Sequence, residues 1–523
     1  MNKFFALVVL TAVAASSALA QGPVTSLNTD VVVVGAGPAG LSATLTAAQG
    51  GAKVVVLEKN PFPGGTGLFG EGIFAAESDM QVKEAYFLTK DDAFQREMTE
   101  DNWKGNAPLL RRYINESNFT LKWLQDQGVV FSKVATLNPG GYRSWHLIAG
   151  HHGEELIRTL YFKAKDDPNV QIYLETTGKE LLFDANHQVS GVRATAKDGS
   201  TLEIHAKAVI LCTGGFGDNL EWVKKYSGNE HGGMATPLGK TGFGIRMAVS
   251  AGAVTEGMGT MQYFPLGSFR AKIEDTNTLP MPIASAAVQP FNVIVNVHGD
   301  RFVDETMTFD FSKMGNAIDR QYQHTAWAIL DSSLLQQYTT RGPEAGVGVL
   351  VPALTPIPPL AGWVDEQVAA KNPDYHAAND IRDLAQQIGV PADELAQTVA
   401  NYNHAAETNY DPEFVKPRLY LHPLTGKLYA IRIVNYYLNS LGGVRTNKYL
   451  QPLNEQDEPI NHLYVTGNDV GGLYGDTYPL GLSGGTYGFA VNSGRMAAKD
   501  ALLRFVGSAA PANRAAEFHE QRR

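Results

Sequence analysis

A β-branched run that ends in a glycine turn constrains this chain more than any other stretch. Residues 30–34 read DVVVV, and residues 35–40 read GAGPAG. This order of strand, tight turn and helix start lets backbone amides approach a pyrophosphate, whose charge the helix N-terminus stabilises. Gly40 supplies the third glycine of the pattern, which allows close packing of helix on strand. The turn residues that we expect to bind a dinucleotide are Gly35, Ala36, Gly37, Pro38 and Ala39.

A second apolar run makes the dinucleotide interpretation more specific. Residues 53–57 read KVVVL and are followed by Glu58. This acid lies about 20 residues beyond the turn, where an acidic side chain hydrogen-bonds a ribose hydroxyl. Alone, Glu58 would read as a surface acid at a strand end. Because strand, turn, helix, second strand and acid follow in order, we expect a bound dinucleotide.

Composition limits the number of domains and the kinds of partner. The 523 residues are enough for two or three domains. The formal net charge of −10 argues against nucleic acid or an anionic membrane as a partner. The single cysteine, Cys212, excludes an intramolecular disulfide and the CxxCH motif of a c-type haem. Cys212 lies in an apolar run, residues 208–212, so we expect it in the core rather than as a reactive thiol.

The N-terminus has the pattern of a secretory signal peptide. Lys3 is a short basic region, residues 4–15 are apolar, and residues 16–20 (SSALA) form an A-x-A cleavage site. The apolar run is too short for a membrane anchor. We therefore expect an exported protein, periplasmic or secreted, whose mature chain begins near Gln21 and has no stable membrane insertion.

Periodicity predicts the remaining elements. A glycine-dense loop, residues 61–75, follows Glu58, and a small antiparallel meander leads into residues 208–216. Gly389-Val390-Pro391 separates two amphipathic helices, residues 381–388 and 392–402. A long helix, residues 489–505, opens in a glycine setting, and residues 508–523 read as a loose tail. His146, His151 and His152 show no metal-binding spacing, so we expect no metal site and solvent-exposed histidines.

In this order, the motifs resemble the flavoprotein family of fumarate reductase and succinate dehydrogenase, whose relatives include flavocytochrome c reductases, urocanate reductases and 3-ketosteroid dehydrogenases. The resemblance runs from about residue 28 to about residue 507. It rests on the glycine turn with Glu58-Lys59, residues 64–72, 213–216, 299–305, 441–444 and 465–468, and the closing Gly484-Gly485 helix. It implies an α/β fold with a Rossmann-like FAD-binding domain built from both chain ends, residues 28–258 and 431–507. An inserted α+β capping domain, residues 259–430, would hold the substrate.

The resemblance also implies how FAD is held. Members that bind FAD covalently have a histidine where this chain has Gly65, so we expect non-covalent FAD. A usual Gly-Asp-Gly reads Gly242-Phe243-Gly244, and a usual glutamate near the C-terminal flavin contact is Asn468. The resemblance adds these expected FAD contacts to those of the turn and Glu58: Lys59, Gly65, Thr66, Gly72, Thr213, Gly214, Asn468, Leu482 and Ser483.

The catalytic positions differ from those of fumarate reductases. The histidine and arginine positions that clamp substrate carboxylates there fall at Phe264, Asn439 and Leu482, and a Thr-Glu pair falls near Ala284-Ser285. Only the arginine of an Arg-Phe-Val-x-Glu motif is retained, as Arg301. Burying two carboxylates without paired cations is very costly. We therefore expect a substrate other than fumarate or succinate.

Two residues are candidates for moving the proton that accompanies hydride transfer. Arg301 is either a proton donor, as in fumarate reductases, or a structural residue. Tyr478 lies in Asp476-Thr477-Tyr478-Pro479, which resembles the Tyr-Pro-Gly segment of 3-ketosteroid dehydrogenases, where tyrosines act as acid or base; otherwise its ring lines the core. The other clustered tyrosines are Tyr263, Tyr436, Tyr437, Tyr474 and Tyr487. The expected apolar pocket is formed by Phe264, Phe291, Leu438 and Leu482.

Two functions follow. The first is an FAD-dependent oxidoreductase that acts on a CH–CH group of an enone, enoate or ketosteroid-like substrate, by hydride transfer at flavin N5. The second is a flavin-binding electron-transfer or binding subunit without turnover of its own, paired with a separate cytochrome. In either case an external cytochrome or quinone is a possible electron partner.

Overall fold

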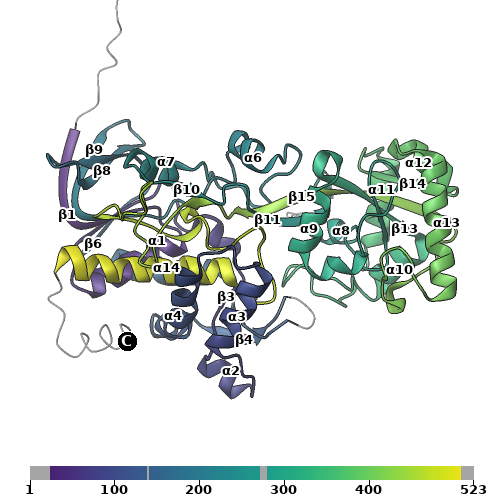
Figure 1. The fold of residues 1–523 in the computed structure, drawn as a ribbon, viewed down its shortest axis with the longest axis horizontal. Helices are drawn as coiled ribbons and strands as arrows, with labels where there is room; N and C mark the ends of the chain where they lie inside the picture. Colours follow the sequence, from purple (N-terminus) through teal and green to yellow (C-terminus); the bar gives the residue numbers. More distant parts are fainter. Residues whose placement is uncertain (1–23, 138–140, 271–279, 508–523) are drawn as a thin grey trace, which may run out of the picture.

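The computed structural model describes residues 24–137, 141–270 and 280–507. The expected signal peptide and the C-terminal tail lie outside these ranges. The described chain forms two lobes side by side (Figure 1). One lobe contains both ends of the described chain, and the other is formed by the middle of the sequence.

The first lobe is built on a seven-stranded sheet of order β6-β2-β1-β9-β8-β7, with β17 paired to β9. In the parallel part, β2 and β9 pair with β1, β6 pairs with β2, and β17 pairs with β9. In the antiparallel part, the meander, β8 pairs with β7 and with β9. The bounds are β1 Val24–Val34, β2 Val54–Leu57, β6 Val170–Tyr173, β7 Thr176–Phe183, β8 Val189–Ala196, β9 Thr201–Leu211 and β17 Leu463–Val465. The predicted meander is confirmed for β7, β8 and β9, with β9 one continuous strand through the polar residues at its middle. It is wrong for the strand expected to open it, residues 170–174, because β6 pairs parallel with β2 on the opposite side of the sheet.

The valines of β1 explain why this strand lies at the sheet centre. Val31, Val32 and Val33 are fully buried, as expected for a parallel strand covered on both faces. Helix α1 (Pro38–Gln49) follows the turn and packs against helix α14 (Gly485–Ala501). A Cβ atom on Gly40 would lie 1.8 Å from the carbonyl oxygen of Gly35. The predicted close packing of helix on strand is therefore confirmed.

A helical layer and a small sheet complete the first lobe. Its helices are α2 (Asp79–Lys83), α3 (Lys90–Glu100), α4 (Ala107–Asp126), α5 (Gly153–Asp166), α6 (Leu220–Ser227) and α7 (Phe243–Ser250). The small sheet pairs β5 (Trp145–Ile148) with β3 (Gly72–Phe74) and β4 (Phe131–Ala135). The two-residue strands β10 (Thr255–Glu256) and β16 (Gly443–Val444) also pair.

The expectation of exposed histidines is wrong for His146. This residue lies in the middle strand of the small sheet and is fully buried. Its Nε2 atom is 2.6 Å from the Ser78 hydroxyl and its Nδ1 atom is 3.0 Å from the Ser144 carbonyl oxygen. Burial lowers the pKa of His146 to about 4, so the ring is neutral near pH 7. His146 and the neighbouring Trp145 both belong to strand β5.

The second lobe surrounds a five-stranded sheet of order β11-β15-β13-β12, with β14 also paired to β15. The strands are β11 (Met261–Gly267), β12 (Val293–Val295), β13 (Thr325–Asp331), β14 (Tyr375–Ala378) and β15 (Leu428–Ser440). The helices are α8 (Met281–Ser285), α9 (Phe311–Asp319), α10 (Ser332–Thr340), α11 (Leu360–Ala369), α12 (Ile381–Ile388) and α13 (Ala392–Thr408). The two predicted helices around Pro391 are α12 and α13.

Strands β11 and β15 connect the lobes (Figure 1). The two strands pair antiparallel from Met261↔Ser440 to Gly267↔Ile433. Along β15, Ile433 belongs to the apolar core of the second lobe and Tyr437 to that of the first. The boundary between the two cores therefore crosses this strand pair, where side chains of both lobes meet. In the described ranges, no helix is long and apolar enough to span a membrane.

Candidate active site

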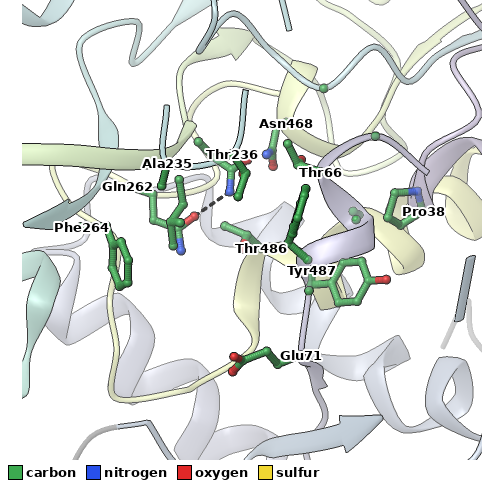
Figure 2. A pocket seen from close by; sticks show the side chains of 18 of the residues that line it. Pro38, Thr66, Glu71, Ala235, Thr236, Gln262, Phe264, Asn468, Thr486 and Tyr487 are labelled. Carbon is green, nitrogen blue, oxygen red and sulfur yellow. Dashed lines mark hydrogen bonds between the residues drawn. The ribbon is translucent and has the colours of Figure 1, made fainter. Parts of the chain in front are cut away.

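A cavity of about 900 Å³ runs from the glycine turn after β1 to the facing surface of the second lobe. Figure 2 shows part of its wall. Twelve of the expected cofactor-binding residues line it: Gly35, Gly37, Pro38, Ala39, Glu58, Lys59, Gly65, Thr66, Gly72, Thr213, Gly214 and Asn468. This volume is at the upper end of the range for single-ligand pockets and suits a large cofactor with a substrate beside it.

At one end of the cavity, Glu58 is held in place by backbone donors. Its Oε2 atom accepts a hydrogen bond of 2.9 Å from the Ala36 N–H, and its Oε1 atom accepts one of 2.9 Å from the Asn60 N–H. A carboxylate offers about four acceptor positions, so capacity is left for a ribose hydroxyl. Lys59 follows, and its Nζ atom donates to the Gly239 carbonyl oxygen.

Two helix N-termini open onto the cavity without a side-chain cap. Helix α1 has Gly37 as its N-cap, and helix α14 has Gly484. Neither first turn carries an acidic residue. An uncapped helix start presents free N–H groups and a partial positive charge, which suit a pyrophosphate or an electron-rich carbonyl. Two such ends on one cavity fit the two polar parts of a flavin dinucleotide.

The shape of the wall also fits FAD. A Cβ atom on Gly65 would have no neighbour within 4 Å, so this glycine faces open space in the loop that follows the ribose site. The turn that follows strand β9 is fixed by buried Asp469, whose carboxylate accepts hydrogen bonds from the N–H groups of Thr213 and Gly215. Asp469 thus holds the turn around Gly214 against the cavity.

Three expected cofactor contacts do not reach the cavity wall. The Ala36 side chain is fully buried in the core, and its backbone N–H holds Glu58 instead. Leu482 packs in the core of the first lobe. Ser483 is fully buried and its hydroxyl accepts a hydrogen bond from the Leu137 N–H. The chain reaches the wall one residue later, at Gly484, because Leu482 and Ser483 are turned inward to anchor the start of α14.

The far end of the cavity is apolar and is formed mostly by the second lobe. Phe264 and Phe311 meet edge to face there, with ring centroids 5.2 Å apart. The other apolar side chains of this end are Leu266, Met281, Val288, Phe309, Met314, Val347, Leu350 and Leu438. Two members of the expected apolar pocket, Phe291 and Leu482, lie outside its lining. A dicarboxylate would find no arginine among the described residues of this wall.

One buried lysine, Lys240, faces the middle of the cavity. Its Nζ atom donates to Oδ1 of Asn439 at 2.6 Å, to Oγ1 of Thr66 at 3.2 Å and to the Leu438 carbonyl oxygen at 3.4 Å. Burial lowers the pKa of Lys240 to about 8. All three acceptors are neutral, and no carboxylate of the described chain forms an ion pair with it. The Nδ2 atom of Asn439 in turn donates to Oε1 of Gln262 at 2.7 Å.

One acid, Glu71, also lines the cavity between the lobes, and its carboxylate points inward (Figure 2). Its Oε1 atom accepts a hydrogen bond of 3.0 Å from the N–H of Val349, in the second lobe. Burial raises the pKa of Glu71 to about 7, against the opposing effect of that hydrogen bond. A carboxyl group with this pKa exchanges its proton near neutral pH, as acid–base catalysts do.

Of the six clustered tyrosines, only Tyr478 and Tyr487 line the cavity. The Tyr478 hydroxyl accepts a hydrogen bond of 3.3 Å from the Thr486 N–H at the start of α14. Burial raises the pKa of Tyr478 to about 12. Among the other four, the Tyr437 hydroxyl donates to the Gly217 carbonyl oxygen at 2.9 Å, whereas the buried Tyr474 hydroxyl has no hydrogen-bond partner in the described ranges. The structure therefore narrows the tyrosine candidates to two.

Arg301 does not line the cavity. It is 4% exposed, and its Nε and Nη2 atoms each donate to Glu305 at 2.9 Å. Its Nη1 and Nη2 atoms donate to Asp411 at 3.1 and 3.0 Å, and Nη1 also donates to Glu413 at 3.4 Å. A guanidinium group has five N–H donors, and these five bonds use all of them. Burial disfavours the charged form, but the hydrogen bonds that Arg301 donates to the Glu305 and Asp411 carboxylates outweigh this effect and raise the pKa of Arg301.

Comparison with known proteins identifies the class of this chain. A family model described as "FAD binding domain" matches residues 30–484. The chain is 31% identical over 477 residues to the vinyl phenol reductase of Lactiplantibacillus plantarum, covering 90% of this chain and 96% of that protein. It is 28% identical over 494 residues to the fumarate reductase (cytochrome) of Shewanella frigidimarina, covering 93% and 78%. The chain is an FAD-dependent oxidoreductase.

The structural comparison agrees with this class. The 3-ketosteroid Δ1-dehydrogenase from Sterolibacterium denitrificans, solved in complex with 1,4-androstadiene-3,17-dione, has the same fold, with a TM-score of 0.73. It is 22% identical and the match covers 91% of this chain and 99% of that one. The family model over residues 30–484 and the 31% identical relative show that the chain belongs to the flavoprotein family of the fumarate reductases, as its motifs predict.

Proposed function

We propose that this protein reduces a carbon–carbon double bond that is conjugated to an oxygen-bearing group in an apolar, uncharged substrate. The observation that carries the proposal is the cavity itself, which continues from the residues expected to bind FAD to an apolar wall of the second lobe. The similarity to a vinyl phenol reductase over nearly all of that protein's length supports this choice. A dicarboxylate is excluded from the proposal because Arg301 has no donor left and lies outside the cavity, and no arginine of the described chain lines the wall to pair with two buried carboxylates.

The similarity to a vinyl phenol reductase favours reduction over dehydrogenation. When bound, FAD supplies hydride transfer to or from a carbon of the substrate. Tyr478, with a pKa of about 12, is protonated throughout the physiological range. The phenol therefore carries a proton that it can give to the neighbouring carbon, although burial makes it a weaker acid than a free phenol. We assign Tyr478 as the proton donor and Glu71 as the group that exchanges protons with solvent near pH 7. Arg301 is assigned a structural role.

Three further properties belong to the proposal. FAD is bound non-covalently, because Gly65 offers no side chain for attachment; acid precipitation is then expected to release all flavin into the supernatant. The protein is exported, as residues 1–20 suggest, and N-terminal sequencing of the secreted chain is expected to begin near Gln21. Its electrons come from an external donor such as a cytochrome or a quinone.

The proposal is tested with the FAD-loaded protein and reduced methyl viologen as the electron source. A panel of 4-vinylphenol, 2-cyclohexenone, 4-androstene-3,17-dione and fumarate is offered, and products are analysed. We expect saturated products from at least one uncharged substrate and none from fumarate. If dithionite bleaches the flavin but no uncharged member is reduced, the protein is an electron carrier or binding subunit and the proposal fails.

A further inference from the structure

Three polar side chains form a hydrogen-bonded chain across the cavity wall. Lys240 precedes α7, Asn439 lies near the end of β15, and Gln262 lies near the start of β11. Asn439 and Gln262 are opposite each other in the register of the two strands, which holds their amides side by side. All three residues line the cavity. Figure 2 shows Gln262 with its hydrogen bond to the neighbouring amide.

Lys240 fixes the direction of both hydrogen bonds that link the three side chains. An ammonium group has three donors and no acceptor, so it requires the oxygen of Asn439 rather than the nitrogen. The NH₂ group of Asn439 then faces Gln262 and requires an acceptor, which is Oε1 of Gln262 at 2.7 Å. The Nε2 atom of Gln262 is left over. It has no hydrogen-bond partner among the residues that the structure describes, and in Figure 2 it points into the cavity.

We propose that Nε2 of Gln262 is the donor that binds the substrate's oxygen, and that Asn439 and Lys240 are positioning residues that hold this donor toward the substrate. The proposal rests on the proposed function and names its substrate class: an unsaturated ketone or a vinyl-substituted phenol, whose oxygen accepts a hydrogen bond. A neutral donor beside Phe264 suits a neutral oxygen in an apolar pocket. A site built to bind an oxygen discriminates strongly against analogues that cannot satisfy it.

The direction of the hydrogen bond between Asn439 and Gln262 can be reversed without changing the shape of either side chain. In the variant Asn439→Asp, both side-chain oxygens are acceptors, so Lys240 is satisfied by one and the other requires a donor. Gln262 must then turn its NH₂ group toward strand β15 and present its oxygen to the cavity. The cavity would lose a donor and gain an acceptor. A ligand that only accepts hydrogen bonds would bind worse, whereas a phenol, which can also donate, would still bind.

The experiment measures ligand binding to the oxidised, FAD-loaded protein through the change in flavin absorbance. The probes are acetophenone, which only accepts, and 4-ethylphenol, which accepts and donates. For Asn439→Asp we expect the Kd of acetophenone to rise at least tenfold and that of 4-ethylphenol to change less than threefold. The control is Asn447→Asp, because Asn447 donates to Oε1 of Gln451 at 3.2 Å in a similar pair away from the cavity. Its Kd values are expected to stay at the wild-type level.

An unchanged ratio of the two Kd values in Asn439→Asp would overturn the proposal, whether or not the wild type reduces the substrates. If that variant does not fold, Gln262→Glu tests the same point, because its carboxylate accepts from Asn439 and presents oxygen to the cavity. An unchanged ratio there has the same meaning. Failure of the proposed function is recognised separately, since it leaves the wild type without turnover even where both probes bind.

Discussion

Arg301 and Asp411 face each other through two hydrogen bonds, of 3.1 and 3.0 Å, in the interior of the second lobe. Glu305 binds the same guanidinium group through two more bonds. The arginine comes from the loop after β12 and the aspartate from the loop after α13, so the pair ties two distant segments together. This arrangement gives Arg301 a structural role that requires no place at the cavity.

The structural role of Arg301 predicts a loss of stability in Arg301→Lys. A lysine has one point charge and three donors, and it cannot form two bidentate pairs. We expect the free energy of unfolding to fall by about 3 kcal/mol, since a buried ion pair is left partly unmade. Turnover per FAD-bound molecule is expected to stay within about threefold.

Urea unfolding and steady-state turnover provide the check. The control is Arg382→Lys, whose partner Asp393 is exposed, and it is expected to change stability by less than about 0.5 kcal/mol. An Arg301→Lys protein that keeps full stability and bound FAD but loses turnover would show that the arginine is catalytic.

The assignment of Tyr478 as proton donor predicts a defect in turnover without a defect in flavin binding. For Tyr478→Phe we expect a fall of about 10²-fold or more in kcat, because a positioned acid contributes about that much. The control is Tyr437→Phe, which removes a buried hydroxyl bonded to the Gly217 carbonyl oxygen and is expected to keep kcat. Flavin absorbance verifies that both variants hold FAD. Full turnover by Tyr478→Phe would remove this tyrosine from the mechanism.

The raised pKa of Glu71 predicts that the free energy of unfolding depends on pH. Its pKa is about 7 in the folded protein, against 4.5 for an ordinary glutamate. Between these values the folded state holds a proton that the unfolded state has released. The free energy of unfolding contributed by this group therefore falls as pH rises from about 4.5 to about 7. In Glu71→Gln, which keeps an oxygen for the Val349 N–H, this part of the slope is expected to vanish.

Thermal unfolding of the wild type and Glu71→Gln from pH 4.5 to 8 measures the difference. Glu84→Gln is the matched control, because Glu84 also accepts a backbone hydrogen bond, of 3.1 Å from the Val134 N–H. Its Tm profile is expected to run parallel to the wild type. Parallel profiles for Glu71→Gln as well would refute the raised pKa.

The placement of the Glu58 carboxylate at the ribose site predicts that the affinity for FAD depends on this residue. In Glu58→Gln, an acceptor is replaced by a donor at the ribose site, and a hydrogen bond to a charged group contributes about 1.5–3 kcal/mol. We expect the Kd for FAD of the apoprotein to rise about 10- to 100-fold, measured by the recovery of flavin absorbance or fluorescence on titration. Glu180→Gln, at an exposed position, should leave the Kd unchanged. An unaltered Kd in Glu58→Gln would contradict the placement of the ribose.

The flavin-binding residues were predictable from the sequence because the motifs that indicate them are local. The strand, the turn that needs Gly35 and Gly40, and the acid Glu58 lie within 30 residues, and each has a single physical reason. Charges inside the glycine-rich loops were also visible, at Glu71 and Lys240. A charged residue next to glycine in a loop expected to wrap a cofactor is a signal for a cavity residue.

The substrate side was not predictable in the same way, because it depends on contacts between distant segments. Gln262 and Asn439 meet only through the register of β11 and β15. The structural role of Arg301 depends on its partner Asp411, which lies 110 positions away in the sequence. The burial of His146 depends likewise on the pairing of β5 with two other strands. Periodicity locates strands but does not state which strands pair.

The most direct test of the account is a single-turnover measurement of flavin reoxidation. The FAD-loaded protein is reduced anaerobically with one equivalent of dithionite and mixed with 4-vinylphenol, 2-cyclohexenone or fumarate in a stopped-flow spectrometer. We predict rapid return of oxidised-flavin absorbance with at least one uncharged substrate and no return with fumarate. Reoxidation by fumarate alone would contradict it.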